Sequence, residues 1–188
     1  MANHAAARRN LSDTLLDDQA AALKILGVKT VYCADFPNIK MNTVPHLELV
    51  QFVEHCIEEF QADAIYTHHP ADVDNDHVMT SCAVQAAARL FQRKEGVAPL
   101  KGLAYMEVPS STEWSLDVAA NRFQPNLFVE VGKSGVEVKK KALNAYSGVM
   151  REYPHPRSTE AIEGLAAYRG AQAGCNYAEA FECVFRRL

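Results

Sequence analysis

The segment 66–77 is the most informative stretch of the sequence for chemistry. It holds three histidines and three aspartates: His68, His69, Asp72, Asp74, Asp76 and His77. Imidazole nitrogens and carboxylate oxygens are the ligands expected around a catalytic zinc or a similar divalent ion with one open position. Three carboxylates within five residues would repel one another when ionised, and a bound cation or a helix N-terminus would relieve that repulsion. The segment is therefore a candidate metal or catalytic site.

The same residues allow two other interpretations. Asp and Asn are favoured in turns and at helix N-caps without any metal, so Asp76 could simply cap a helix that opens at His77. The spacing within the loop would also let His69, Asp72 and His77 form a self-contained set of three ligands. Three histidines in one loop favour a functional site over a plain turn, and at this point both ligand arrangements stay open.

The apolar pattern predicts the elements that position this segment. Strands are expected at 28–34, 62–67, 102–108, 127–131 and 181–186, and helices at 45–60, 77–93, around 136–150 and at 159–169. The alternation of short β-like runs with longer amphipathic runs predicts a doubly wound, Rossmann-like α/β layer with a mostly parallel sheet. Because such sheets bind ligands outside the carboxyl ends of their strands, we expect the site in the loops after Ala34 and Thr67.

Composition narrows the class of protein. The chain has 188 residues and a formal charge of −4, which fits one domain over 1–188 and argues against a nucleic-acid binder. No apolar run reaches the roughly 18 residues that a membrane-spanning helix needs. Five scattered cysteines without a Cys-x-x-Cys pair suit reduced thiols in the cytoplasm. We expect a cytoplasmic protein with no nucleic-acid or membrane partner, and a homo-oligomer is left open.

Several segments, in the right order, resemble the LmbE/PIG-L family of metal-dependent sugar de-N-acetylases. Thr67-His68, followed by Asp72, Asp74 and Asp76-His77, is similar to the family's second motif, in which a strand ends and an Asp-His pair opens the next helix. The resemblance continues through 107–114, 123–126, 140–146, 154–158, 169–170 and 178–181. It implies an LmbE-like layered fold and hydrolysis of an N-acetyl group from a glucosamine-like sugar or sugar conjugate.

The resemblance also implies roles for five residues. His77 would be the metal ligand that this chain contributes, with zinc or another divalent metal as the cofactor. Asp76 would orient the loop or His77, and Asp74 stands where an electrostatic helper usually sits, so both are expected catalytic residues. His155 and Arg157 are expected to bind the substrate, because the matching family segment borders the sugar.

One departure from the family pattern concerns the first motif. Its Ala-His-Pro-Asp-Asp-Glu sequence has no counterpart here, and with it the first strand, further metal ligands and the general base are missing. We therefore expect an N-terminally incomplete de-N-acetylase domain, with a non-catalytic sugar-binding relative or an inactive fragment as the alternative. A nucleotide-binding transferase of the Rossmann type is a second alternative, although no glycine-rich phosphate loop follows any predicted strand.

Overall fold

A computed structural model describes residues 13–116 and 122–188 of the chain. The chain divides into two compact units, each described by itself below. The first unit comprises 1–31 with 128–180, and the second comprises 32–127 with 181–188. Five α-helices, labelled α2 to α6, and four strands are found among the described residues. No helix in the described part of the chain is both long and apolar enough to span a membrane.

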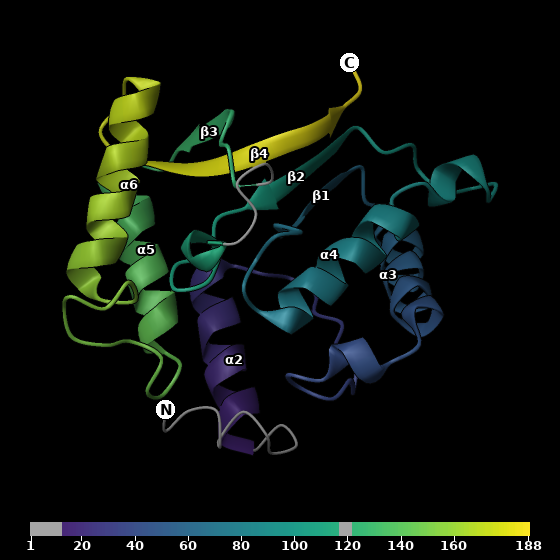
Figure 1. Ribbon diagram of the computed structural model, residues 1–188, viewed down its shortest axis with the longest axis horizontal. Helices are drawn as coiled ribbons and strands as arrows, with labels where there is room; N and C mark the ends of the chain where they lie inside the picture. The colour runs from purple at the N-terminus through teal and green to yellow at the C-terminus, as the bar shows by residue number, and fades with distance from the viewer. Residues whose placement is uncertain (1–12, 117–121) are drawn as a thin grey trace. The chain divides into compact units, whose positions relative to one another are not determined.

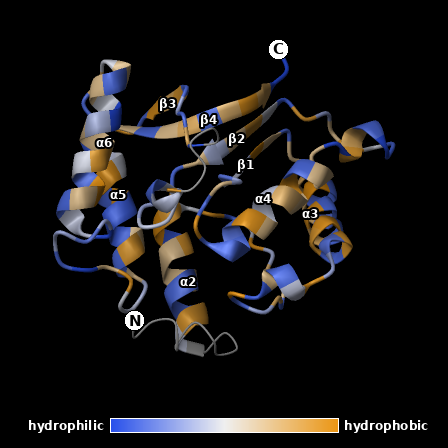
Figure 2. Ribbon diagram, in the orientation of Figure 1, coloured by the Kyte–Doolittle hydropathy of each residue, from blue (hydrophilic) through white to orange (hydrophobic). Residues whose placement is uncertain are grey.

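The second unit is built on two helices that cover two strands (Figure 1). Helix α3 (His46–Phe60) packs on α4 (Asn75–Ala87), and α4 in turn packs on β1 (Ala64–His68). Apolar residues recur along α3 at the three- and four-residue steps that give a helix one buried face, and Figure 2 shows apolar residues interspersed with polar ones there. Leu49 and Ala87, which are 2% and 0% exposed, lie in the resulting core.

The sheet is mixed, and the expectation of a mostly parallel sheet is wrong. Strand β1 pairs in parallel with β2 (Gly102–Met106), from Ala64 opposite Gly102 to His68 opposite Met106. Strand β2 then pairs antiparallel with β4 (Ala178–Arg186), with a register shift between Leu103 and Ala104. The hydrogen-bonded strand order is β1-β2-β4-β3. An alternating apolar pattern fixes which face of a strand is buried but not its direction, so β4 could not be oriented from sequence.

The first unit contains α2 (Asp13–Leu26), α5 (Gly132–Asn144) and α6 (Thr159–Ala173). Helix α5 contacts both α2 and α6. Strand β3 (Leu127–Glu130) is followed directly by α5. Helix α6 begins at Ser158, whose hydroxyl accepts a hydrogen bond from the backbone N–H of Ala161, and it ends at Gly174 in the left-handed conformation with φ 77°. These are the standard devices that start and stop a helix.

Several predicted elements differ from the structure; the helix expected around 136–150, for example, runs from Gly132 to Asn144. The segment 28–34 forms no strand and has no regular secondary structure, and Val28, Val31 and Tyr32 are 38–45% exposed. An extended segment becomes a strand only when it pairs with a neighbour, and this requirement cannot be read from local composition. The helix predicted at 77–93 starts two residues earlier and ends at Ala87, and a short 3-10 helix (Leu90–Gln92) follows.

Candidate functional site

The loop between β1 and α4 carries the residues singled out in the sequence. Strand β1 ends at His68 and α4 begins at Asn75, so the loop lies at the carboxyl end of a strand, as expected. Asp74, rather than Asp76, is the N-cap of α4. Its Oδ1 accepts a hydrogen bond of 2.8 Å from the backbone N–H of Asp76, while its backbone is extended.

His77 and Asp72 form the central pair of the site. The Nδ1 atom of His77 lies 3.1 Å from Oδ1 of Asp72, and 3.3 Å from the hydroxyl oxygen of Ser111. The Ser111 hydroxyl itself donates to Asp72 Oδ1, and the Thr112 hydroxyl donates to Oδ2 at 3.2 Å. Asp72 is 6% exposed and His77 is partly exposed. The buried carboxylate of Asp72 therefore contacts one ring nitrogen of His77, a partly exposed residue in the first turn of α4.

The electrostatics of this pair favour its charged form. Burial alone would raise the pKa of Asp72, but hydrogen bonds from His77, Ser111 and the Asp74 backbone lower that pKa to about 2. Burial opposes charging of His77, yet the hydrogen bond to Asp72 and the negative charges of the loop raise its pKa above the ordinary value. Asp72 is thus ionised at neutral pH, and it accepts hydrogen bonds only.

His68 lies directly against His77. The two rings are stacked, with centroids 4.0 Å apart and planes 13° apart. Burial, followed by the nearby charge of His77, lowers the pKa of His68 to about 4, so its ring is neutral at physiological pH. Its buried Nδ1 has no hydrogen-bond partner in the described structure, and neither has the buried hydroxyl of Thr67. Such buried polar atoms usually receive a partner from water or a ligand.

The His69 side chain is buried, and both of its ring nitrogens face other groups of the protein. Its side chain is 1% exposed, its Nδ1 accepts a hydrogen bond of 3.1 Å from the backbone N–H of Ala71, and its Nε2 faces Glu182 at 3.5 Å. The rings of Tyr105 and Phe123 meet it edge-on. With both nitrogens directed at other groups, His69 does not join Asp72 and His77, and the self-contained set of three ligands is not formed.

Asp76 anchors a neighbouring loop. Its carboxylate accepts hydrogen bonds from the backbone N–H groups of Ile39 and Met41, the second at 3.0 Å. Ile39 has a positive φ of 60°, an unfavourable conformation for a β-branched residue that the carboxylate of Asp76 helps to hold. Asp76 therefore orients the loop 39–41, while Asp72 is the carboxylate that orients His77.

His155 and Arg157 belong to the first unit, so their proximity to His77 stays a prediction. Within that unit they lie in a turn: the His155 backbone N–H donates to the Glu152 carbonyl, and the Arg157 backbone N–H donates to His155 Nδ1. The buried Nε of Arg157 has no hydrogen-bond partner in the described structure. Burial and the nearby Arg151 lower the pKa of Arg157.

The side chains around His77 do not make up the metal site that the resemblance implies. Among residues 13–116 and 122–188, no group of three His, Cys, Asp or Glu side chains is arranged to hold a metal ion. A catalytic zinc typically takes three protein ligands and a water. The stacked rings of His68 and His77 are nearly parallel, so both cannot point a nitrogen at one ion. The described residues thus supply one oriented imidazole and do not by themselves fit a metal site.

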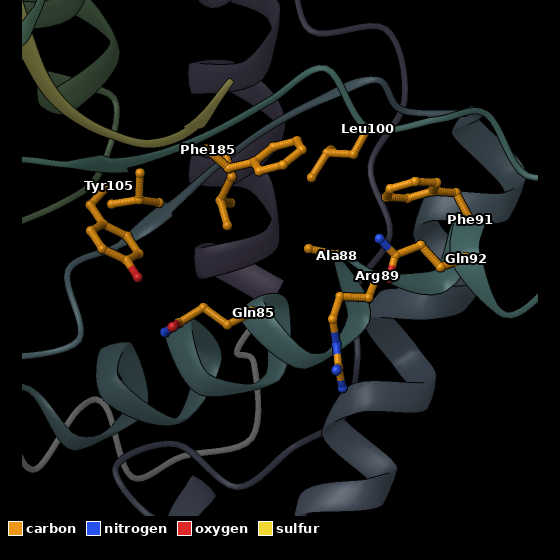
Figure 3. Close-up of a pocket in the computed structure, with 10 residues that line it drawn as sticks. Gln85, Ala88, Arg89, Phe91, Gln92, Leu100, Tyr105 and Phe185 are labelled. Carbon is orange, nitrogen blue, oxygen red and sulfur yellow. The ribbon is translucent and has the colours of Figure 1, made fainter. Parts of the chain in front are cut away.

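A separate pocket of about 290 Å³ lies in the second unit beside the C-terminal end of α4 (Figure 3). Tyr105 and Phe185 from the sheet face Gln85 and Ala88 across it. Its lining is largely apolar and includes neither Asp72 nor His77. The pocket is therefore distinct from the loop that carries the histidines.

Three functional neighbours were not anticipated from the sequence. Ser111 and Thr112 hydrogen-bond to Asp72 and Glu182 faces His69, although all three lie at least 39 residues further along the chain than their partners in the β1–α4 loop. Ser111 and Thr112 fall inside the segment 107–114 that resembles the family, which was the available signal. Nothing in the local pattern around Glu182 points to His69.

Comparison with known proteins supports the resemblance. The family model of the GlcNAc-PI de-N-acetylases (PIG-L) matches residues 2–88, which include the whole β1–α4 loop. No curated protein sequence matches the chain significantly. The resemblance inferred from the second motif is therefore confirmed over residues 2–88.

Solved structures share the fold. A conserved protein of Thermus thermophilus, TT1542, is 21% identical with a TM-score of 0.73, over 99% of this chain and 79% of that one. The N,N'-diacetylchitobiose deacetylase of Pyrococcus horikoshii is 15% identical with a TM-score of 0.68, over 91% and 63%. The 4-carboxy-2-hydroxymuconate hydratase GalB of Pseudomonas putida is 21% identical with a TM-score of 0.68, over 94% and 73%. At these identities the likeness establishes the fold alone.

Proposed function

We propose, from the match of residues 2–88 to the family model of the PIG-L de-N-acetylases, that the chain acts in the hydrolysis of an N-acetyl group. The substrate class is a glucosamine-like sugar or sugar conjugate. The observation that carries the proposal is the pairing of His77 with the buried carboxylate of Asp72 in the matched region, 3.1 Å apart. A carboxylate on one imidazole nitrogen is the arrangement that makes the other nitrogen a good ligand or proton acceptor.

Amide hydrolysis needs a water to attack the acetyl carbonyl and a group that moves the water's proton to the leaving amine. Asp74, at the position where the family has an electrostatic helper, and Asp76, which orients the loop, are the catalytic residues that we propose in this chain. Asp76 uses its carboxylate to hold the loop 39–41, whereas the N-cap bond of Asp74 uses Oδ1. Of the two, we assign Asp74 to the reacting groups and Asp76 to positioning.

Zinc or another divalent metal is the proposed cofactor, with His77 as the ligand from this part of the chain. Such an ion would polarise the acetamide carbonyl and activate water. A single imidazole does not make a metal site, and the described residues supply no group of three ligands. His155 and Arg157 are the proposed sugar contacts, because a guanidinium can bind oxygens through two parallel hydrogen bonds.

The test is acetate release from N,N'-diacetylchitobiose and an N-acetylglucosamine conjugate, with zinc supplied and metal content measured on the same sample. We expect His77→Ala to lower the rate by about 100-fold or more, the contribution typical of a proton-transfer or ligand group. His46→Ala is the matched control, since His46 is an exposed histidine at the start of α3. Sugar binding without acetate release from the wild-type chain would contradict catalysis and would favour a non-catalytic sugar-binding relative.

A further inference from the structure

The carboxylate of Asp72 collects hydrogen bonds from several parts of the second unit. Oδ1 accepts from the backbone N–H of Asp74 at 2.8 Å and from the Ser111 hydroxyl, and it faces His77 Nδ1 at 3.1 Å. Oδ2 accepts from the Thr112 hydroxyl at 3.2 Å. The residue is 6% exposed, so water competes little for these oxygens. Such a satisfied carboxylate has a fixed orientation.

The two hydroxyls come from a turn that is itself held in place. After β2, the carboxylate of Glu113 accepts hydrogen bonds from the backbone N–H groups of Ser110 and Ser111, at 2.6 and 3.0 Å. The Thr112 hydroxyl accepts a hydrogen bond of 2.8 Å from the backbone N–H of Val108. Because Thr112 already accepts there, its own proton is available for Asp72. The turn 108–113 therefore presents both hydroxyls as donors.

The hydrogen bonds around His77 determine which of its ring nitrogens carries a proton. The single hydroxyl proton of Ser111 is used on Asp72, so the Ser111 oxygen can only accept from His77 Nδ1, 3.3 Å away. Asp72, as a carboxylate, can also only accept from that nitrogen. Both neighbours of Nδ1 are acceptors, so Nδ1 must carry a proton. In the neutral ring the lone pair is then on Nε2.

We propose that Asp72, Ser111 and Thr112 are positioning residues that hold His77 in the tautomer with the proton on Nδ1, leaving the Nε2 lone pair free for a ligand or a proton. This role rests on the proposed function, because His77 is the imidazole that the proposed deacetylation would use. Ser111 is 39 residues from Asp72 in sequence, so the turn after β2 controls a side chain on α4.

The test reads the tautomer directly and needs neither metal nor substrate. Long-range ¹H–¹⁵N correlation spectra of the ¹⁵N-labelled chain, recorded at alkaline pH where the ring is neutral, distinguish protonated from unprotonated ring nitrogens. We expect a protonated Nδ1 and an unprotonated Nε2 for His77. Ser111→Ala should lower the ratio of the two tautomers by about tenfold, the change expected from losing one hydrogen bond, and Ser111→Thr, which keeps the hydroxyl, should restore it.

Ser110→Ala is the matched control, because Ser110 takes part in the same turn through its backbone N–H. Asp72→Asn should disturb the tautomer more than Ser111→Ala, and the serine variants keep the test decisive if that protein does not fold. A wild-type His77 with its proton on Nε2, or a Ser111→Ala spectrum equal to that of the wild type, would overturn the proposal. The proposed function fails separately, if the wild type shows the expected tautomer but releases no acetate from N,N'-diacetylchitobiose.

Discussion

Oδ1 of Asp72 and Nδ1 of His77 lie 3.1 Å apart, and the aspartate side of this pair is the more deeply buried. Removing the carboxylate leaves the hydroxyls of Ser111 and Thr112 and the Asp74 N–H without their acceptor. We expect Asp72→Ala to lower the free energy of unfolding by about 2–4 kcal/mol, since unpaired buried polar groups cost roughly 1–3 kcal/mol each and part of that cost relaxes. Urea unfolding of the wild type and of Asp72→Ala measures this difference in the free energy of unfolding.

The control for this substitution is Asp17→Ala on the exposed face of α2, which should change the free energy of unfolding by less than about 0.5 kcal/mol. Equal destabilisation by the two variants would show that the buried network around Asp72 adds no stability of its own.

The neutral, stacked ring of His68 predicts a dependence of stability on pH. Its folded-state pKa of about 4 lies below the ordinary value of 6.5, so the unfolded chain binds more protons between these two values. Stability should fall as the pH drops from about 6.5 to 4, by roughly 3 kcal/mol from this residue. His68→Phe keeps an aromatic ring and removes the titration.

Urea unfolding at pH 7, 6, 5 and 4 provides the comparison between the wild type and His68→Phe. The variant should show the smaller loss of unfolding free energy over this range, because its residue 68 takes up no proton on unfolding. Parallel curves for the two proteins would mean that His68 titrates alike in both states.

Leu49 tests the packing between α3 and α4. It is 2% exposed and lies in the core with Val50, Ala83 and Ala87. Leu49→Ala should lower the free energy of unfolding by about 2–5 kcal/mol, because both transfer free energy and packing around the cavity are lost. Leu47→Ala is matched in chemistry and in helix, but Leu47 is 64% exposed, so about 0.5 kcal/mol or less is expected. Similar losses would disprove this orientation of α3.

Two glycines of α6 give a second matched pair. A Cβ at Gly170 would lie 2.7 Å from the backbone of Cys175 and Asn176, whereas a Cβ at Gly164 meets nothing within 4 Å. Gly170→Ala should therefore destabilise the chain by about 1–3 kcal/mol. Gly164→Ala should stabilise it by about 0.5–1 kcal/mol, since alanine is the better helix former. Thermal unfolding of both variants distinguishes the opposite signs, and a stable Gly170→Ala protein would contradict the close approach.

The helices could be predicted well because their information is local. The apolar positions of α3 recur every three or four residues, and Gly27, with φ 70°, follows the last residue of α2 as a C-cap glycine does. The strand at 28–34 was predicted wrongly for the opposite reason. A β-like composition does not specify a partner, and pairing depends on chain that is distant in sequence.

The candidate site was predicted in part. The loop from His68 to His77 was found from its residue types, since imidazoles and carboxylates gather there at the end of a strand. The separate roles of Asp72, Asp74 and Asp76 could not be predicted from the sequence, because an aspartate can equally cap a helix, anchor a loop or pair with a histidine. The 3.1 Å contact between Asp72 and His77, with Ser111 bonded to the same carboxylate, identifies which aspartate orients His77.

The antiparallel pairing of β4 with β2 has a consequence for how the second unit folds. Tyr105 pairs with Glu182, and Glu182 also faces His69, 113 residues earlier in the chain. Contacts of such long sequence separation raise the contact order, because the entropy of closing a long loop must be overcome before the pairing stabilises anything. The environment of His69 is therefore expected to form late, after the helical contacts of α3 with α4.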